Sequence, residues 1–529
     1  MPTDCVDYQN SGYFTPLIID YLNQKPTLAP FYNRFPTLDN FGLQLAEKSN
    51  NFKDANRKIL VSVLQKQYQN LKVSDLTQSH IESLTESNAF TVTTGHQLNL
   101  FTGPLYFLYK IISTINLAKA LKIKYPESHF VPLYWMATED HDFEEINYFN
   151  FNGKKFRWHK ESAGPVGRLS TSGLEEVLEV FASELGSSLN AATLKKLFKK
   201  SYLEHDNLTD ATRFLANELF AAKGLVILDA DDTELKRQFS PYIKEELLQQ
   251  TSCKCVIETS EKLKDYGVQV NPRAINLFYL EDHLRERIIL EGENYKVNNT
   301  QILFSRSEIL SLLEKNPEKF SPNVILRPLY QEVILPNLCY IGGGGELSYW
   351  LELKSYFDSA NVTFPMLLLR NSVLLATEKQ AKKADNLALT WKDLFSKPAD
   401  LYSEKTKGFS EFPVDLSIQK DHLKTQFHYL ELLAQQTDPS FLGAVKAQQA
   451  KQIKGLEHLE KRLLKAQKRK YADVLQRIAN LQQALFPNQN LQERQANFSE
   501  FYLEYGLDLI DRLQAELHPL DTQFSVLVL

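Results

Sequence analysis

The first 370 residues alternate between short apolar runs and stretches with helical spacing, which is the pattern of an α/β fold. A β-type run at 89–94 is followed by a segment, 108–118, with apolar residues at helical spacing, and then by an apolar run at 130–136. A strand, a helix and a strand over about 45 residues form the unit of a parallel sheet. We predict a Rossmann-like core with a parallel sheet, to which three more runs contribute strands: 224–230, 337–341 and 364–369.

Two segments interrupt this order of strands and helices. Residues 147–169 contain Asn152-Gly153, a dipeptide typical of tight turns, so we expect a hairpin insertion at about 145–170. Residues 276–297 alternate between apolar and polar positions, which predicts a β-meander at about 265–300. With these insertions, the core is expected to span residues 1–415.

Beyond residue 415 the apolar positions recur at threes and fours, and few glycines or prolines interrupt them. This pattern over residues 416–487 predicts an antiparallel coiled-coil hairpin with its turn at Asp438-Pro439. A final aromatic-rich helix and an apolar tail make up residues 488–529. Because a row of Val and Leu seldom stays exposed, we expect the tail to return to the core as a last strand.

Composition excludes several classes of protein. Of the 529 residues, 43% are hydrophobic and 24% are charged, as in globular proteins and unlike disordered ones. The formal net charge of -5 excludes a surface that is wholly a nucleic-acid footprint. Four cysteines are too few for a disulfide framework, and the most apolar run, 364–375, is too short to cross a bilayer. Without the basic and apolar start of a signal peptide, the sequence predicts a soluble cytoplasmic protein with no membrane or nucleic-acid partner.

The predicted coiled coil carries many more Lys and Arg than Glu between residues 445 and 470. One interpretation is a solvated helix face, and the other is a stripe that binds phosphate or nucleic acid. No aromatic side chains are interleaved with these charges, which argues against nucleic acid.

Three segments follow predicted strands, and a doubly wound sheet binds its ligands at the carboxyl ends of its strands. The first leads from the strand at 89–94 into the next helix, whose expected first residue is Pro104 with Thr102 as its cap. Glycines let the backbone approach a ligand, and a helix N-terminus offers free N–H groups to a phosphate or carboxylate. An ordinary strand-to-helix turn is the alternative. The candidate binding residues are Thr94, Gly95, His96, Gln97, Thr102, Gly103, Tyr106 and Lys110.

The second segment packs five carboxylates and one imidazole into residues 139–145. Their repulsion costs free energy, which a metal, a cationic substrate or a proton-transfer role would offset. The structural alternative is that Asp and Glu cap the following helix and a histidine orients them. The spacing fits no standard zinc pattern, so we predict no metal site. The catalytic candidates are Asp140, His141 and Asp142, and the binding candidates are Glu139 and Asn147.

The third segment combines an arginine with a run of four glycines that precedes a predicted helix. Bare backbone leaves room for a ligand, and a guanidinium can hold a carboxylate or phosphate through two hydrogen bonds. A flexible hinge or a close helix–strand crossing is the alternative. An Arg-Asn pair follows the strand at 364–369. It could bind an anionic group of a substrate, or, nearly as well, the asparagine could cap a helix beside a surface arginine. The candidate binding residues are Arg327, Gly343, Gly344, Glu346, Arg370 and Asn371.

Taken together, these segments resemble a known family, the cysteine ligases of bacillithiol biosynthesis (the BshC family). The resemblance covers essentially the whole chain, in the same order of motifs, and one departure is His96, where the commoner form of the family has glutamine. The motifs that carry it are Thr94-Gly-His-Gln97, Phe101-Thr-Gly-Pro-Leu-Tyr106, Glu139-Asp-His-Asp142, Glu145-Ile-Asn147, Arg327-Pro-Leu329, the glycine-rich turn with Glu346, Leu369-Arg-Asn371 and Leu485-Phe-Pro487.

The resemblance implies a nucleotidyltransferase-like Rossmann core with inserted connecting segments and a coiled coil through which two copies form a homodimer. It also implies a ligase that joins the carboxyl group of cysteine to the amine of glucosaminyl-malate, which is the last step of bacillithiol synthesis. The activating cofactor is not defined by the resemblance, and ATP is the candidate.

Elementary chemistry adds the roles that such a ligase needs. Hydroxide is a poor leaving group, so the acid must first be activated, and the glycine turns at Gly95 or Gly343 could neutralise the phosphate of an activated acid. The amine must lose a proton before it attacks, and His141 or Asp142 could act as the base. The two carboxylates of malate call for cationic partners, for which the candidates are Arg327, Arg370 and Lys110.

Two other interpretations fit parts of the pattern. A nucleotidyltransferase that activates another acid would share the core, and it would exchange pyrophosphate with ATP in the presence of that acid. A coiled-coil interaction protein without catalytic activity belongs to a different class, and the polar cluster at 139–142 argues against it. Removal of residues 440–485 separates the two classes, because a scaffold would lose all function whereas an enzyme would lose chiefly dimerisation.

Overall fold

A five-stranded parallel sheet forms the centre of the protein. In the computed structural model, which describes residues 3–529, its strands lie in the order β13-β12-β2-β3-β6 and neighbouring strands are parallel. Each of the five predicted runs forms one of these strands, so the predicted Rossmann-like α/β class is confirmed. The chain order reverses between β2 and β12, which is the switch point where such sheets bind ligands. The strands are β2 Ala89–His96, β3 His129–Met136, β6 Val226–Asp229, β12 Asn337–Gly342 and β13 Met366–Leu369.

The central strands are buried on both faces, which explains why they are near-continuous apolar runs in the sequence. Every residue of β2 and β12 is buried. The helix α6 (Tyr106–Lys124) packs against β2 and β3, and α3 (Leu38–Asn51) packs against β12. Within residues 3–529, each helix is too short or too polar to cross a membrane.

The turn that leads into α6 differs from the prediction. The helix begins at Tyr106 without a side-chain cap, so the expectation that Pro104 opens it and Thr102 caps it is wrong. The backbone of Phe101, Thr102 and Gly103 instead has positive φ angles of 48°, 67° and 62°. Asn497 holds this conformation, because its amide donates to the carbonyl oxygens of Phe101 (2.8 Å) and Gly103 (2.6 Å).

A second, antiparallel sheet lies beside the central one and has the strand order β10-β9-β8-β7-β11. It contains the meander expected at about 265–300 and adds β10 and β11 to it. A separate hairpin of β4 and β5 turns at Asn152-Gly153. The strands are β4 Tyr148–Phe151, β5 Lys154–Arg157, β7 Leu277–Glu281, β8 Leu284–Glu291, β9 Asn294–Val297, β10 Leu303–Phe304 and β11 Phe320–Pro322.

Glu500 attaches this hairpin to α24 (Phe498–Tyr505), since the backbone N–H of Asn152 donates to Glu500 Oε1 at 2.9 Å. Burial raises the pKa of Glu500 to about 7. The folded-state pKa therefore exceeds that of a free carboxyl group, about 4.3, and stability falls as pH rises between these two values. We expect Glu500→Gln to remove this pH dependence and to raise the free energy of unfolding at pH 8 by about 1–3 kcal/mol.

Urea unfolding between pH 4.5 and 8 measures this effect. The control is Glu504→Gln, which changes an exposed carboxyl group of the same helix and should retain the wild-type pH dependence. If the Glu500→Gln protein loses stability with rising pH as steeply as the wild type, the Glu500 carboxyl is not the cause.

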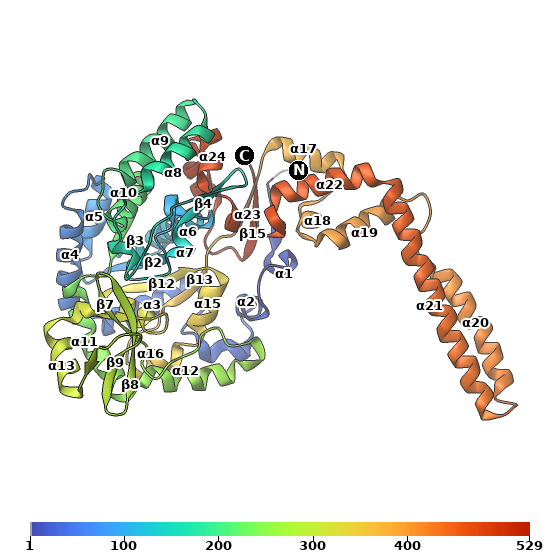
Figure 1. Cartoon of the computed structure of the whole chain (residues 1–529), viewed down its shortest axis with the longest axis horizontal. Coiled ribbons are helices and arrows are strands. Elements are labelled where there is room, and N and C mark those ends of the chain that lie inside the picture. The colour runs from blue at the N-terminus through green and yellow to red at the C-terminus, as the bar shows by residue number, and fades with distance from the viewer. Residues whose placement is uncertain (1–2) are drawn as a thin grey trace.

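The C-terminal third forms an arm and then returns to the body (Figure 1). The helices α20 (Ser417–Ala434) and α21 (Pro439–Lys470) pack along each other and project from the body as the arm. The next helix, α22 (Ala472–Leu485), lies against the body and buries Leu475, Ile478, Leu481 and Leu485.

The apolar tail forms β15 (Gln523–Val528), which belongs to a small sheet of its own rather than to the central one. It pairs antiparallel with β1 (Asp4–Asp7) and parallel with β14 (Val373–Ala376), so the two ends of the chain lie side by side (Figure 1). The other α-helices away from the site are α1 Tyr8–Ser11, α2 Pro16–Leu22, α4 Asp54–Tyr68, α5 Asp75–Ser83, α8 Leu174–Leu185, α9 Leu189–Tyr202, α10 Leu208–Phe220, α12 Thr251–Lys262, α13 Arg306–Lys315, α16 Lys354–Ser359, α17 Glu378–Asn386, α18 Trp391–Phe395, α19 Pro398–Phe409, α23 Gln492–Gln495 and α25 Asp508–Glu516.

Candidate active site

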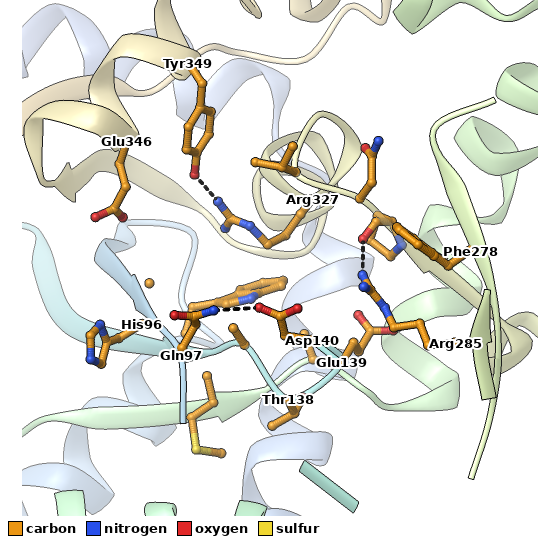
Figure 2. A pocket seen from close by; sticks show the side chains of 18 of the residues that line it. His96, Gln97, Thr138, Glu139, Asp140, Phe278, Arg285, Arg327, Glu346 and Tyr349 are labelled. Carbon is orange, nitrogen blue, oxygen red and sulfur yellow. Dashed lines mark hydrogen bonds between the residues drawn. The ribbon is translucent and has the colours of Figure 1, made fainter. Parts of the chain in front are cut away.

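A cavity of about 580 Å³ lies at the carboxyl edge of the central sheet, at the switch point between β2 and β12. Residues at the ends of β2 and β3 line one side, and β7 and β8 of the antiparallel sheet line another (Figure 2). The helices α14 (Leu326–Ile334) and α15 (Gly344–Leu351) contribute side chains from a third direction. The volume is in the range of pockets that enclose a small molecule, so this cavity is the candidate active site.

The cavity brings together residues from all three predicted segments. Arg327 and Glu346 approach from the helices, while the acidic segment and the first glycine turn approach from the strand ends (Figure 2). Nine of the predicted site residues line it: Gly95, His96, Gln97, Tyr106, Lys110, Glu139, Asp140, Arg327 and Glu346.

The other predicted residues do not line the cavity. Arg370 pairs with Glu493 at 2.6 Å with both side chains buried, and the amide of Asn371 donates to the carbonyl of His518 at 2.9 Å. The N–H of Gly343 donates to Glu346 at 3.1 Å, so it is not free for a phosphate. The ten residues outside the lining are Thr94, Thr102, Gly103, His141, Asp142, Asn147, Gly343, Gly344, Arg370 and Asn371.

Cations of the protein itself neutralise the acidic segment. Glu139 forms an ion pair with Lys236 of α11 (Thr233–Gln249), and Glu144 forms one with Arg157 of β5. These pairs offset the repulsion among the carboxylates. From the sequence, a metal or a cationic substrate was a candidate for this role. Within residues 3–529, no three His, Cys, Asp or Glu side chains are grouped to hold a metal ion.

Of the three catalytic candidates, Asp140 alone lines the cavity. Asp142 caps the short helix α7 (Phe143–Ile146), as in the structural alternative, and His141 accepts a hydrogen bond from Arg285 at 2.6 Å. Gln97 donates to Asp140 at 2.9 Å. Burial acts to raise the pKa of Asp140, but the hydrogen bond from Gln97 and the charge of Arg285 outweigh it and lower the pKa, so this carboxyl group is ionised.

An ion pair between the buried Lys110 and the partly exposed Glu346 lies at the end of the cavity next to β2 and α15. Lys110 approaches Glu346 at 2.6 Å and donates to the carbonyl of Gly95 at 2.7 Å, while the hydroxyl of Tyr340 donates to Glu346 at 2.7 Å. Burial acts to raise the pKa of Glu346, but Lys110 and the other donors bring it to about 2. Lys110 is therefore engaged within the protein rather than free for a substrate carboxylate.

His96 lies beside this ion pair as a neutral imidazole. Its exposed fraction is 7%, and burial together with the charge of Lys110 lowers its pKa to about 3. The Nε2 atom has no hydrogen-bond partner within residues 3–529, and the ring meets that of Tyr106 edge to face at 5.5 Å. His96 is thus an uncharged polar group beside the cavity, with one buried ring nitrogen that no group within residues 3–529 engages.

Arg327 is a cation without a carboxylate partner within residues 3–529. One of its terminal nitrogens, Nη2, donates to the hydroxyl of Tyr349 at 2.7 Å, and the other, Nη1, is buried without a hydrogen-bond partner (Figure 2). A Cβ atom at Gly95 would stand 3.8 Å from Nη1 and 3.1 Å from the hydroxyl of Tyr340, so the glycine keeps this space open. A guanidinium with an unused N–H is chemically suited to an anion.

Three arginines of the antiparallel sheet region were missed by the sequence analysis. Arg285 is held by Ser321 Oγ (3.2 Å) and the carbonyl of Pro322 (3.3 Å), and its guanidinium lies over the ring of Phe278 at 4.0 Å. Two of the three are two residues apart in β8 and therefore lie on the same face of the strand. This spacing is the sequence pattern from which they could have been predicted. The three are Arg273, Arg285 and Arg287, and they add three cationic side chains to the lining of the cavity.

The fold and the cavity together define a class of protein, a Rossmann-like α/β protein with a coiled-coil arm and an arginine-lined cavity at the switch point of its sheet. The family model for the N-terminal Rossmann-like domain of bacillithiol biosynthesis BshC matches residues 1–371, and the model for the C-terminal coiled-coil domain matches residues 373–529. The chain therefore belongs to the BshC family of bacillithiol biosynthesis. The second model includes β14 and the helices that pack on the body, whereas the sequence analysis placed the boundary at residue 415.

Relatives of this chain cover its whole length. A protein of Flavobacterium johnsoniae named "Putative cysteine ligase BshC" is 68% identical over 529 residues, which is 100% of both chains. A protein of the same name from Flavobacterium psychrophilum is 62% identical over 100% of this chain and 99% of its own. A third, from Cytophaga hutchinsonii, is 38% identical over 97% of this chain and 96% of its own.

Proposed function

We propose that the protein joins the carboxyl group of cysteine to the amine of glucosaminyl-malate, which forms an amide bond in the last step of bacillithiol synthesis. Membership of the BshC family and relatives named as cysteine ligases support the reaction class. The single observation that carries the substrate assignment is Arg327, a half-buried guanidinium in the lining of the cavity whose Nη1 has no hydrogen-bond partner within residues 3–529.

Malate carries two carboxylates. The cavity is lined by more cationic side chains than its acidic side chains can pair with. Of the three cations first considered for this role, Lys110 is paired with Glu346 and Arg370 with Glu493, which leaves Arg327. We infer that Arg327 binds one carboxylate and that Arg285 or its neighbours in the antiparallel sheet bind the other. Arginine suits this role because its planar guanidinium can donate hydrogen bonds to both oxygens of a carboxylate.

Asp140 is the acidic group that we assign to the amine of the substrate. It lies in the cavity with Gln97 fixing one oxygen, whereas Asp142 is occupied as a helix cap. An ionised carboxylate attracts an ammonium group and can accept its proton as the amine attacks the activated acid. On this proposal, arginines of the cavity bind the malate end of the substrate and Asp140 binds its amine end.

ATP fits as the co-substrate that would activate the acid, as an acyl phosphate or an acyl adenylate. The arginines of the antiparallel sheet region that a bound malate does not use are chemically suited to phosphate oxygens. We place the reaction in the cytoplasm, because all four cysteines are free thiols, as in a reducing compartment: Cys5, Cys253, Cys255 and Cys339.

Thiol profiling by mass spectrometry in a strain that lacks this chain tests the proposed function. The expected result is accumulated glucosaminyl-malate with no bacillithiol, and recovery of bacillithiol when the chain is returned. An unchanged thiol pool would overturn the proposal. Pyrophosphate exchange by the purified protein with an acid other than cysteine would favour the alternative nucleotidyltransferase.

We further propose that the arm forms a homodimer. Large apolar side chains are exposed near its tip: Tyr429 at 68%, Leu433 at 53% and Phe441 at 43%. A second arm packed against this surface would remove these side chains from water, which is favourable by about 25 cal/mol per Å². We expect Leu433→Glu to halve the mass measured by light scattering, from twice the chain mass to 60.9 kDa.

The matched control for this change is Leu189→Glu, since Leu189 is 88% exposed on the body, far along the chain from the arm. This variant should retain the dimer mass. A Leu433→Glu protein that still elutes at twice the chain mass would argue against a dimer through the tip. Deletions of the arm should end before Lys470, because α22 beyond it is part of the packed body.

A further inference from the structure

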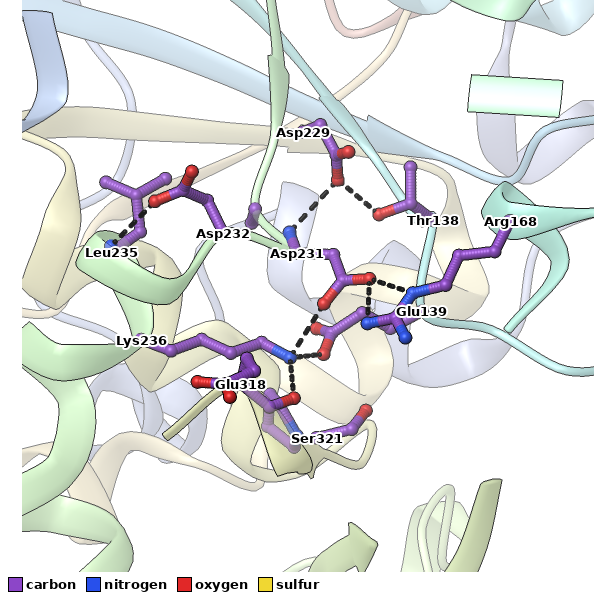
Figure 3. A network of polar contacts seen from close by, with 12 residues as sticks. Thr138, Glu139, Arg168, Asp229, Asp231, Asp232, Leu235, Lys236, Glu318 and Ser321 are labelled. Atoms are coloured by element: carbon purple, nitrogen blue, oxygen red, sulfur yellow. Dashed lines mark hydrogen bonds and ion pairs between the residues drawn. The ribbon is translucent and has the colours of Figure 1, made fainter. Parts of the chain in front are cut away.

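A buried lysine joins the segments that form two walls of the cavity. The side chain of Lys236 in α11 is 1% exposed, and its ammonium pairs with Asp231 at 2.9 Å and with Glu139 (Figure 3). It also donates to the backbone carbonyl of Glu318 at 3.1 Å. These three partners come from different segments, after β3, after β6 and just before β11.

Two of these contacts lead to the cavity. Glu139 lines the cavity and precedes Asp140, the carboxylate assigned to the amine. On the other side, Glu318 leads into β11, whose Ser321 holds the guanidinium of Arg285 through a hydrogen bond of 3.2 Å. One ammonium therefore connects the wall that carries the carboxylate with the wall that carries the arginine.

The ammonium stays charged although it is buried. Burial acts to lower the pKa of Lys236, but the charges of Glu139 and Asp231 outweigh it and raise the pKa. A second connection runs in parallel, because Arg168 pairs with Asp231 and with Asp282, both at 2.8 Å. Asp282 lies in the turn between β7 and β8, so this pair too connects the central sheet with the antiparallel sheet.

We propose that Lys236 is a positioning residue of the ligase, which sets the spacing between Asp140 and Arg285 together with the hydrogen bond from Arg285 to His141. This inference rests on the proposed function. Lys236 is not among the cavity-lining residues, so it acts through its partners rather than on the substrate. Misplacement of binding groups by about 1 Å can cost two orders of magnitude in rate.

The test measures binding of glucosaminyl-malate to the purified full-length protein by calorimetry, together with thermal unfolding. We expect Lys236→Met to weaken binding at least tenfold and Lys236→Arg to stay within about threefold of the wild type, because the guanidinium keeps the charge and the reach to all three partners. The matched control is Lys48→Met. Lys48 is also a buried ammonium, 2% exposed, and pairs with the fully buried Glu332 at 3.0 Å, next to the amino end of β12.

The control should lose comparable stability and keep wild-type affinity. Failure of the wild type to bind would contradict the proposed function itself. A wild type that binds, with Lys236→Met binding as tightly as Lys48→Met, would overturn the positioning role alone. If Lys236→Met does not fold, the double variant Lys236→Met/Glu139→Gln carries the same expectation, because it neutralises the carboxylate that would otherwise lose its ion-pair partner, whereas Asp231 keeps Arg168.

Discussion

Replacement of Arg327 by glutamine is expected to deplete bacillithiol in a complemented deletion strain, because about 2.7 kcal/mol of lost transition-state binding slows the ligase about a hundredfold. Charge-assisted hydrogen bonds contribute about 1.5–3 kcal/mol each, and the substrate carboxylate would lose its buried partner. Arg327→Lys should not restore the activity, since an ammonium lacks the planar set of N–H groups that can bond Tyr349 and a carboxylate at the same time.

Mass spectrometry of the thiol pool measures this effect, with accumulation of glucosaminyl-malate as the second signal. The control is Arg237→Gln, which changes an exposed arginine of α11 outside the cavity and should leave the thiol pool unchanged. Arg327 has no carboxylate partner within residues 3–529, so its loss leaves no acid unpaired and the variant should fold. Wild-type bacillithiol from Arg327→Gln would remove the main support for the substrate assignment.

The sequence was informative about the parallel sheet because its strands are buried on both faces. Such strands are apolar throughout, and the helix between β2 and β3 has an apolar periodicity of its own. The carboxyl-edge rule then directed attention to Gly95 and Asp140, which the fold brings to one cavity. The local apolar pattern and the general rule for parallel sheets were sufficient to predict the central sheet and these two residues of the cavity.

Partners across long sequence distances could not be predicted in the same way. The acidic segment looked as if it needed an external cation, but Lys236 supplies one from a helix that follows a later strand. The turn at Thr102 takes its conformation from Asn497, near the other end of the chain. Pairing of this kind depends on the folded arrangement and leaves no periodic signal in the sequence.

Arg370 is a second case in which the partner could not be predicted from the sequence. The sequence does not distinguish an arginine that binds a substrate from one that pairs with a buried carboxylate. Its guanidinium lies 2.6 Å from Glu493, and the two side chains are 4% and 1% exposed. The other carboxylate oxygen of Glu493 accepts from the backbone N–H of Val373 at 3.1 Å. The pair thus joins the carboxyl end of β13 to the C-terminal region of the chain.

We expect Arg370→Met to lower the free energy of unfolding by about 3–5 kcal/mol, since it leaves an unpaired carboxylate in the interior. Urea unfolding measures this loss. The double variant Arg370→Met/Glu493→Gln should recover most of it, because glutamine is uncharged and can still accept from Val373. If the single variant is as stable as the wild type, the pair does not hold the C-terminal region as the structure indicates.

The double variant also separates the two roles of Arg370. Its binding of glucosaminyl-malate can be measured by calorimetry on a stable protein, so a change in affinity would not be a by-product of unfolding. A purely structural Arg370 predicts an affinity close to that of the wild type, because the side chain does not line the cavity. A loss of tenfold or more would assign Arg370 to the substrate after all, through Tyr106, whose ring lies 4.9 Å from its guanidinium and borders the cavity.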